Sequence, residues 1–417
     1  MNASLPTRLG LLLALYLAQG IPFGIYTQAL PAILRTYEAP LSLISLSGLL
    51  AIPWALKVFW APWVDRYYWP RLGYRRSWIL PMNLGLIGVL VGLAAFDPAS
   101  LRDPTGVYTL FALLFLVNLF AATQDVATDG LAVRILAPHE RGLGNGIQVS
   151  SYRVGIIIGG GLLLYVLDTL GWQLSFIVLI GFSCLLLLPV VLYREPPVLP
   201  EVRAHAHDPV WQIWRDFFRR PGLEGWIWVL VTYKVAESLA SAMVKPMMVD
   251  QGMSLADIGL QVSMAGAVTT ITGAMLGGWL VTRLGRRTGM VAFAAVQSLL
   301  FASYAWPATG QGLAGLSSTQ LIVVINAAEH LLGGMAMAAL LSAVMDRARQ
   351  SHAGVDFTLQ VSLLAVFGGL FYLPAGLLVE QIGYASHFLV AGLAGLLLLW
   401  PAWRYTREPD QLSPEPA

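Results

Sequence analysis

Two aspartates one helical turn apart lie inside an apolar stretch of the sequence. The segment 116–161 opens with an apolar run that carries Gln124, Asp125 and Asp129. Residues four positions apart share one face of a helix, so the two carboxylates project in the same direction. Carboxylates in an apolar helix are costly unless they face a protein interior or a water-filled cavity. We therefore expect these acids to be functional.

The same segment continues through a polar turn into a second predicted helix. The turn, 137–144, contains Arg141, and the helix that follows carries Tyr152 and Arg153. Arg153 has no acid in its own apolar run, so its partner must be another helix, a backbone group or a bound anion. Glycines at 155 and 159–161 follow, and small residues of this kind let two helices pack closely. They equally suit helices that rock against each other.

The composition identifies the kind of protein that must position these residues. Of the 417 residues, 57% are hydrophobic and only 12% are charged, whereas ordinary soluble domains are about 25% charged. Apolar runs of roughly 20 residues can cross a bilayer as helices and are too long for the strands of a β-barrel. The single cysteine, Cys184, excludes an internal disulfide and a cysteine-based zinc site. The net charge of +2 is too small to indicate a nucleic-acid partner.

The apolar runs predict an all-helical membrane protein with about twelve spans. The longest polar interruption divides the chain into an N-terminal six-helix bundle (1–193), a linker (194–222) and a C-terminal six-helix bundle (223–417). The first run follows Arg8 without a small-residue cleavage site, so we expect it to remain as a membrane helix. The predicted spans are 9–31, 41–63, 78–96, 107–133, 143–166, 172–193, 224–246, 256–281, 289–308, 318–344, 355–378 and 384–403.

The distribution of basic residues predicts the orientation of these spans. With the N-terminus in the cytoplasm, roughly nineteen of the 25 lysines and arginines lie in cytoplasmic loops and about three in external loops. An excess of this kind is typical of cytoplasmic loops, so both termini and the linker are predicted to be cytoplasmic. The remaining basic residues, Lys57, Arg153 and Lys234, fall inside predicted spans.

Two short motifs recur in the second half of the chain at an offset of about 212 residues. Gln-Val-Ser occurs at 148–150 and again at 360–362, and Gly171-Trp172 returns as Gly383-Tyr384. A parallel duplication of six-helix halves is common among secondary transporters, whose binding sites lie near the bilayer midplane.

Several polar residues fall about ten residues from the ends of their spans, which places them near mid-bilayer. Lys234 and Glu237 lie at i and i+3 and can pair. Glu329 and His330 are adjacent, so we expect them to point to different faces of their helix. Lys234 and Glu237 could instead form only a structural ion pair. Glu329 and His330 could instead serve only in hydrogen bonds between helices. The full deep set is Gln19, Arg153, Lys234, Glu237, Glu329 and His330.

A charged loop after the second predicted span carries a family resemblance. The pattern Ala61-x-x-x-Asp65-Arg66, followed by the basic stretch 73–76, resembles the loop motif of the major facilitator superfamily. The resemblance implies a twelve-helix transporter fold in which the loop acid, here Asp65 with Arg66, braces the two halves on the cytoplasmic side. The chain departs from the family pattern at Ala61, where glycine is usual. The arginines at 71, 75 and 76 could instead serve only to set the topology.

A second copy of the motif and a narrower resemblance extend this assignment. The stretch 278–287 resembles the second copy, with Arg283 retained and Thr282 in place of the acid. Residues 57–66 and 124–155 look like the muropeptide-permease and acetyl-CoA-transporter branch. Within that branch, the opening at 16–31 resembles siderophore-import permeases of the rhizobactin and pyochelin type.

These features predict a secondary active transporter of the bacterial inner membrane that works by alternating access. The resemblance to siderophore permeases implies that it imports a siderophore, such as ferric pyochelin. The sequence lacks GxxxxGK[ST], so an ion gradient, most simply of protons, is the expected energy source. A muropeptide permease or another organic-anion transporter of the branch is the alternative. A membrane-embedded enzyme would need a convergent catalytic constellation, and no HExxH, GxSxG or DxD-type cluster marks one. A receptor or sensor would need an added soluble module, for which the tails are too short.

The predicted site residues fall into three groups, with no cofactor, no metal and no nucleic acid. We expect a monomer whose partners are a small-molecule substrate, protons and membrane lipid. Asp125 and Asp129 are assigned to the gate because they lie near the cytoplasmic end of their helix, with substrate contact as the alternative. The substrate-binding group is Gln19, Tyr26, Gln28, Tyr152, Arg153 and Lys234; the proton-coupling group is Glu237, Glu329 and His330; the gate group is Asp65, Arg66, Gln124, Asp125, Asp129, Arg141 and Arg283.

Overall fold

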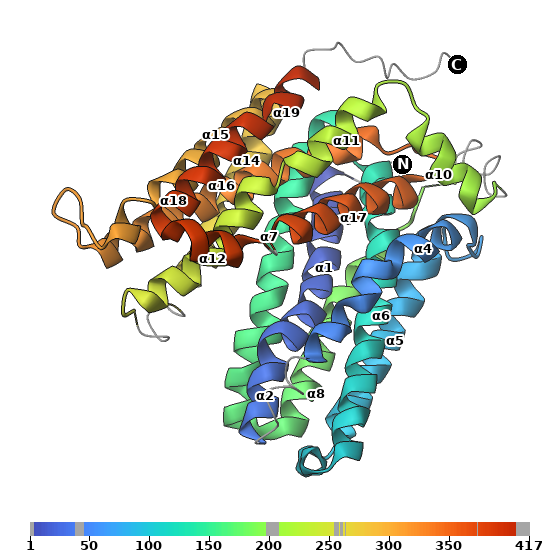
Figure 1. Cartoon of the computed structure of the whole chain (residues 1–417). Coiled ribbons are helices and arrows are strands. Elements are labelled where there is room, and N and C mark those ends of the chain that lie inside the picture. Colours follow the sequence, from blue (N-terminus) through green and yellow to red (C-terminus); the bar gives the residue numbers. More distant parts are fainter. Residues whose placement is uncertain are drawn as a thin grey trace. The chain divides into compact units, whose positions relative to one another are not determined.

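The computed structural model describes residues 4–37, 46–196, 208–253, 258, 262, 264–372 and 374–405. These residues form helices and no β-strand, which confirms the predicted all-helical membrane fold (Figure 1). Ten segments of the described chain are long and apolar enough to cross a membrane. One of them, Pro138–Leu192, has 55 residues and accounts for two predicted spans. The second predicted span, 41–63, corresponds to the shorter helix α4, Ile52–Arg66. The first residues of that span, 41–45, lie outside the described residues.

The bounds of the main helices are α1 Leu5–Gly24, α2 Leu30–Thr36, α4 Ile52–Arg66, α5 Arg76–Ala95, α6 Pro104–Ile135, α7 Arg141–Ile157, α8 Leu163–Leu192, α10 Val210–Phe218, α11 Leu223–Thr232, α12 Val235–Asp250, α14 Ala265–Leu284, α15 Arg286–Ser303, α16 Ser318–Arg347, α17 Ala353–Tyr372, α18 Ala375–Leu398 and α19 Trp400–Tyr405. Helices α5, α6 and α16 follow the predicted spans to within about three residues, whereas α4 begins at Ile52 and α18 at Ala375 rather than at the predicted 41 and 384.

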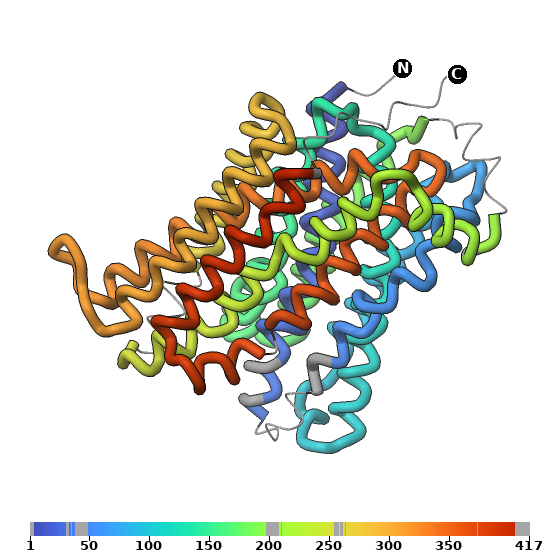
Figure 2. The backbone as a smooth tube through the Cα atoms, turned by 45° about the horizontal axis from the view of Figure 1, so that its top comes forward, coloured from blue at the N-terminus to red at the C-terminus, as the bar shows by residue number. Residues whose placement is uncertain are grey.

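The chain divides into two compact units, each of which takes in a short segment from the other half of the sequence. Unit 1 contains 1–138, 147–210 and the segment 346–359. Unit 2 contains 211–345, 360–417 and the segment 139–146. The tube in Figure 2 shows the course of the chain through both units. Each unit is described by itself below.

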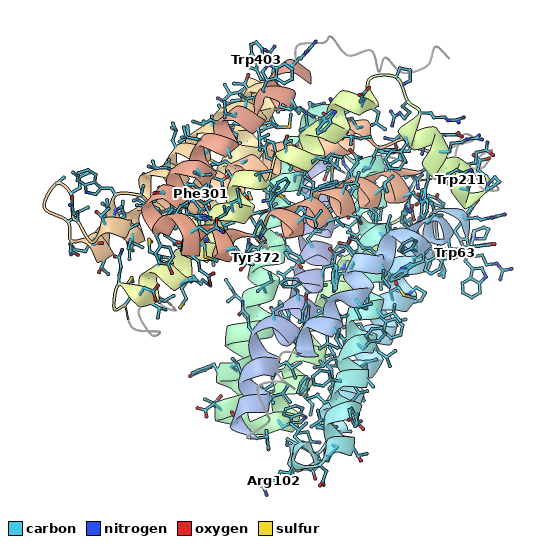
Figure 3. The ribbon with its side chains drawn as sticks, in the orientation of Figure 1. Trp63, Arg102, Trp211, Phe301, Tyr372 and Trp403 are labelled. Atoms are coloured by element: carbon cyan, nitrogen blue, oxygen red, sulfur yellow. The ribbon has the colours of Figure 1, made fainter. Side chains whose placement is uncertain are left out.

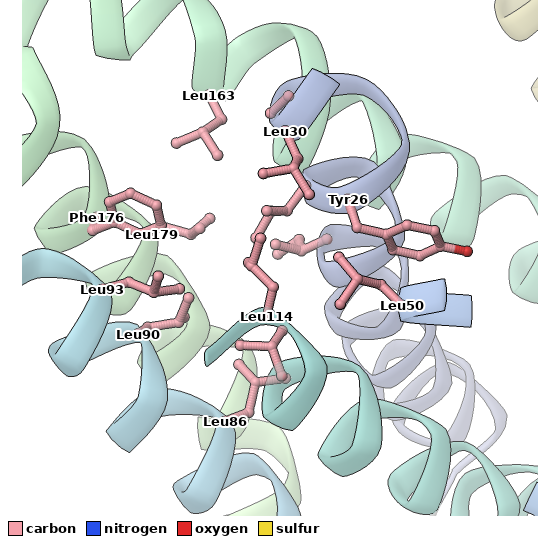
Figure 4. Packing of buried hydrophobic residues seen from close by; sticks show 14 of the residues in the cluster. Tyr26, Leu30, Leu50, Leu86, Leu90, Leu93, Leu114, Leu163, Phe176 and Leu179 are labelled. Atoms are coloured by element: carbon pink, nitrogen blue, oxygen red, sulfur yellow. The ribbon is translucent and has the colours of Figure 1, made fainter. Parts of the chain in front are cut away.

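Unit 1 is a bundle of helices around an apolar core. Helix α5 packs against both α6 and α8, and α1 packs against α6 and α8. Figure 4 shows part of this core, where Leu90, Leu114 and Phe176 meet, each at most 2% exposed. Outside the core the surface is also apolar: Trp63 on α4 is 48% exposed and points outward (Figure 3). An apolar exterior of this kind suits contact with lipid.

Proline and glycine shape the contact of α1 with α7 and with the π-helical turn Ile158–Leu162 that follows α7. Pro22 lacks a backbone N–H for the helical ladder, and α1 widens into a π-helical turn at Ile25–Ala29 just after it. A Cβ on Gly155 would lie 2.8 Å from Cα of Gly20, and a Cβ on Gly159 would lie 2.8 Å from the carbonyl carbon of Ile21. Both glycines therefore let two backbones touch, whereas Gly161 faces open space.

Unit 2 contains the corresponding helices of the second half. Helix α18 packs against α12 and α15, and the rings of Tyr304 and Phe388 lie 5.3 Å apart in its core. The sequence repeat extends to the backbone: Gly171 in unit 1 has φ 75° and ψ 177°, and Gly383 in unit 2 has φ 72° and ψ 164°. Only glycine adopts this conformation readily, so both halves turn sharply at the same repeat position.

Candidate functional site

A buried ion pair in unit 1 joins α4 to the residue that precedes α5. Arg75 donates to Asp65 Oδ1, and both side chains are at most 2% exposed. The other oxygen of Asp65 accepts the backbone N–H of Val355 at 3.0 Å, in the first turn of α17. Glycines make room for this cluster, because a Cβ on Gly354 would lie 2.6 Å from Asp65 Oδ1 and one on Gly130 would lie 2.8 Å from Arg75 Nε. The predicted gate residue Asp65 is thus hydrogen-bonded to the segment 346–359, which belongs to the second half of the sequence but to unit 1 of the fold.

The partner of Asp65 is Arg75 rather than its neighbour Arg66. Arg66 is partly exposed and lies over the ring of Tyr67, 5.5 Å from its centroid. The sequence offered Arg75 as a possible topology residue, yet it is fully buried and stacks on Tyr74 at 4.5 Å. Residues 67–74 form a turn that brings Arg75 back beside α4, which the spacing along the chain did not reveal.

A second carboxylate, Glu195, holds the start of α5. Its two oxygens accept the backbone N–H groups of Arg75 at 2.8 and 3.0 Å and that of Arg76 at 3.2 Å. It also accepts a hydrogen bond from Arg134 Nη1 at 3.0 Å. A helix N-terminus carries unpaired N–H groups and partial positive charge, so a carboxylate stabilises it. Sequence analysis missed Glu195 and Arg134; the only signal was an acid directly after the sixth predicted span.

The two aspartates of α6 lie in a buried charged cluster with residues from three other helices. Lys57 Nζ on α4 pairs with Asp125 Oδ2, and the two side chains are 8% and 10% exposed. Asp129 Oδ1 accepts hydrogen bonds from Tyr16 OH on α1 at 3.0 Å and from Gln148 Nε2 on α7 at 3.4 Å. The sequence placed Lys57 inside a span but assigned it no role, and it missed Tyr16 as a partner.

Three predicted substrate-binding residues lie near the ends of α1 and α7, where each helix runs into a π-helical turn. Tyr26 packs edge-on against Phe23 with ring centroids 5.1 Å apart, and Tyr152 lies 5.8 Å from the same ring. Gln28 lies against Gly160, where an added Cβ would be 2.8 Å from Gln28 Cδ. The structure thus brings Tyr26 and Tyr152 together on Phe23 and sets Gln28 against Gly160.

Arg153 and two glutamines retain free polar groups. Arg153 is exposed and makes no hydrogen bond or ion pair within the described residues. Gln19 and Gln124 are at most 1% exposed, and the amide atoms of both are without a hydrogen-bond partner in the described part of the chain. Buried polar groups are normally satisfied by protein or water. These three side chains therefore offer polar contacts that the described protein groups do not use.

The predicted proton-coupling residues lie in unit 2 and have partners of their own. Lys234 Nζ donates to Glu237 Oε2 at 2.5 Å, as the i, i+3 spacing predicted. His330 Nδ1 lies 2.6 Å from Glu329 Oε2, so the expectation that these two residues point apart is wrong. Adjacent residues leave a helix in different directions, but both side chains are long enough to meet. Gln297 Nε2 donates to Glu329 Oε1 at 3.3 Å.

The two remaining gate residues also lie in unit 2. Arg141 opens α7 and donates from Nη1 to the backbone oxygen of Met345 at 3.2 Å. Arg283 lies over the ring of Trp279 at 4.3 Å. Next to Arg141, a Cβ on Gly142 would lie 2.9 Å from Cγ2 of Thr282. Gly142 and Gly354 are 212 residues apart, so the repeat places an acid against one glycine and a threonine against the other.

Comparison with known proteins defines the class of protein that carries this fold and site. The family model for the Major Facilitator Superfamily matches residues 12–370 and 234–417, so the chain belongs to this superfamily. It is a multi-pass membrane transporter rather than an enzyme. The fold agrees with that of the Escherichia coli fucose:proton symporter, with a TM-score of 0.69 at 15% identity over 95% of this chain and 98% of that one.

Curated relatives match nearly the whole length of the chain. The anhydromuropeptide permease of Escherichia coli (strain K12) is 28% identical over 414 residues, covering 97% of this chain and 82% of that protein. An uncharacterized protein of Haemophilus influenzae is 29% identical over 396 residues, with 92% of both chains covered. The muropeptide-permease resemblance is thereby supported, and the narrower siderophore-permease assignment is not.

Proposed function

We propose that the protein is a proton-driven importer of anhydromuropeptides, or of closely related sugar–peptide anions, in the bacterial inner membrane. The observation that carries this proposal is the similarity to an anhydromuropeptide permease across 97% of the chain. This substrate class is the alternative that the sequence offered beside a siderophore, and the comparisons favour it.

Polar groups of unit 1 suit a ligand of this chemistry. A muropeptide offers sugar hydroxyls, amides and carboxylates. Arg153 can bind a carboxylate through two parallel hydrogen bonds, and its charge is not used by a protein acid in the described chain. Tyr26 and Tyr152 offer an apolar ring with a polar tip, a combination that binds the faces of sugars and peptides. Lys234 of unit 2 remains a proposed contact for a second negative group.

The sequence and the name of a structural neighbour support the proposed coupling to protons. The sequence has no nucleotide-binding loop, so an ion gradient must drive accumulation. A structural neighbour is named a fucose:proton symporter, and we propose proton coupling for this chain as well. The excess of basic residues in alternate loops supports cytoplasmic termini and a cytoplasmic position for the Asp65 gate.

The proposal is tested in bacteria that lack their own anhydromuropeptide permease. Expression of this chain should restore the cytoplasmic content of labelled anhydromuropeptide, measured by mass spectrometry of cell extracts. Cells that express the protein in the membrane at normal level but import ferric pyochelin and no muropeptide would contradict the proposal. The predicted cytoplasmic termini are tested separately. A reporter enzyme that is active only in the cytoplasm should be active when it is fused to either terminus of the protein.

A further inference from the structure

Asp129 is a buried carboxylate that has no basic partner among the described residues. Its side chain is held by two neutral groups, the hydroxyl of Tyr16 at 3.0 Å and the amide of Gln148 at 3.4 Å. The ammonium of Lys57, on α4, is engaged by Asp125, which lies one turn before Asp129 on α6. Asp129 as a residue is 2% exposed. Two carboxylates and one ammonium therefore leave one negative charge uncompensated in this cluster.

An uncompensated buried charge is strongly unfavourable, and an ionised carboxylate can relieve it by binding a proton. We propose that Asp129 is the proton-binding group of this transporter, with the Lys57–Asp125 pair as its fixed counterpart. The inference rests on the proposed function, because a proton-driven importer requires a group that loads and unloads a proton. A proton from water forms a bond to a carboxylate oxygen of Asp129, and on release it returns to water and leaves the carboxylate ionised.

Other charged and titratable groups around Asp129 come from α1, α4, α7 and the residue before α5. The segment 346–359 also packs on α6, and its Arg349 pairs with Asp356 at 2.7 Å. Tyr16 lies on α1 and Lys57 on α4. Arg75, before α5, acts on Asp129 electrostatically but is itself paired with Asp65. Tyr152, on α7, acts on Asp125. None of these groups supplies Asp129 with a cation in direct contact.

Buried polar atoms without partners flank the cluster. Gln124 and Thr128, both on α6, are fully buried, and Gln19 lies one turn beyond Tyr16 on α1. Within the described residues the amides of both glutamines and the hydroxyl of Thr128 find no hydrogen-bond partner. Groups of this kind are normally satisfied by protein or by internal water. Water bound here would give a proton a route to the buried acid.

The acids that the sequence suggested for this role are placed differently. Glu237 has Lys234 at 2.5 Å, and Glu329 has His330 at 2.6 Å. Each therefore has a basic residue in direct contact. Asp129 differs from both in this respect, which is why the geometry favours the cluster of unit 1.

The first test needs no substrate, so it decides the proton site whether or not the substrate proposal holds. The full-length protein in lipid vesicles is titrated while the carboxylic-acid C=O stretch is followed by infrared difference spectroscopy. The wild type should show a titrating band that disappears in Asp129→Asn. The band should persist in Asp65→Asn, a matched control that removes a buried acid with its own arginine. Persistence of the full band in Asp129→Asn, or its loss in Glu329→Gln, would overturn the proposal.

A transport assay provides the second test. In vesicles with labelled anhydromuropeptide, Asp129→Asn should retain more of the substrate exchange across the membrane than of the gradient-driven accumulation. Gradient-driven accumulation should fall by at least about tenfold, and Asp129→Glu should retain part of it. Equal loss of exchange and accumulation would assign Asp129 to structure or binding instead. If the wild type moved no muropeptide at all, the proposed function would fail and the infrared result would still stand.

Discussion

The carboxylate of Asp65 accepts a hydrogen bond from the backbone N–H of Val355 at 3.0 Å, although 290 positions separate these residues in sequence. The first turn of a helix offers unpaired N–H groups and partial positive charge, so an acid fits there. Gly354 permits the approach because it lacks a side chain. The contact fixes a segment of the second half of the sequence to unit 1. Any conformational change that frees this segment must break it.

Arg75 should matter far more for stability than its neighbour in the motif, Arg66. Arg75→Gln leaves Asp65 buried without a cation, and breaking a buried pair in this way costs about 3–5 kcal/mol. Arg66→Gln removes only a stacking contact on Tyr67 at a partly exposed position, so a change below about 0.5 kcal/mol is expected. Denaturant unfolding in detergent measures both. Similar losses for the two variants would show that the Asp65–Arg75 pair is not the stabilising contact.

The glycines of the π-helical turn Ile158–Leu162, which follows α7, should differ sharply in their tolerance of a methyl group. Gly159→Ala would push a Cβ against the backbone of Ile21 and separate α1 from this turn, and overpacking of this kind costs about 1–3 kcal/mol. Gly161→Ala meets open space and should be neutral or slightly stabilising. Thermal unfolding of the two variants tests this, and the midpoint of Gly159→Ala should lie below that of Gly161→Ala. Equal midpoints would mean that the close contact between α1 and this turn does not limit stability.

Sequence patterns predicted the elements of the fold better than the partners within the site. Apolar length alone located most of the spans, and the repeat of Gly171 at Gly383 predicted a duplicated half, because both signals lie in local sequence; the backbone conformation that the two glycines share emerged only from the structure. The contacts of Lys57 with Asp125 and of Glu195 with α5 depend on how separate helices pack. Sequence patterns also did not predict how far side chains extend. Glu329 and His330 were expected to point to different faces of their helix, yet Glu329 Oε2 lies 2.6 Å from His330 Nδ1.

Arg153 should act on substrate rather than on folding. It is exposed and makes no ion pair in the described chain, and an arginine facing hydrocarbon would cost several kcal/mol, so it belongs beside water or a ligand. Arg153→Ala should insert and unfold like the wild type while uptake is abolished. Arg153→Lys, which keeps the charge but loses the planar fork, should restore uptake only in part. Normal uptake by Arg153→Ala would remove this residue from the site.

His352 should make stability depend on pH near neutrality. Burial lowers the pKa of His352, and the charge of Arg349 lowers it further against the opposing effect of Asp65, Asp356 and Asp208. Because the folded-state pKa lies below the unfolded value, the unfolded chain gains its proton first as the pH falls. Stability should be complete above about pH 6.5 and decrease below it.

The control for His352 is a histidine on the surface. Unfolding midpoints measured across this pH range should vary less with pH in His352→Gln than in the wild type. His139→Gln, which alters an exposed side chain, should leave the wild-type dependence in place. An unchanged pH profile in His352→Gln would contradict the assignment.

The central claim is tested most directly by uptake into vesicles that contain only the purified protein and carry an imposed proton gradient, acidic outside. Labelled anhydromuropeptide should accumulate above its external concentration, with saturable kinetics, and an uncoupler should abolish the accumulation. Excess unlabelled anhydromuropeptide should compete, and ferric pyochelin should not. Folded protein that accumulates no muropeptide under the gradient, or that accumulates ferric pyochelin instead, would contradict the claim.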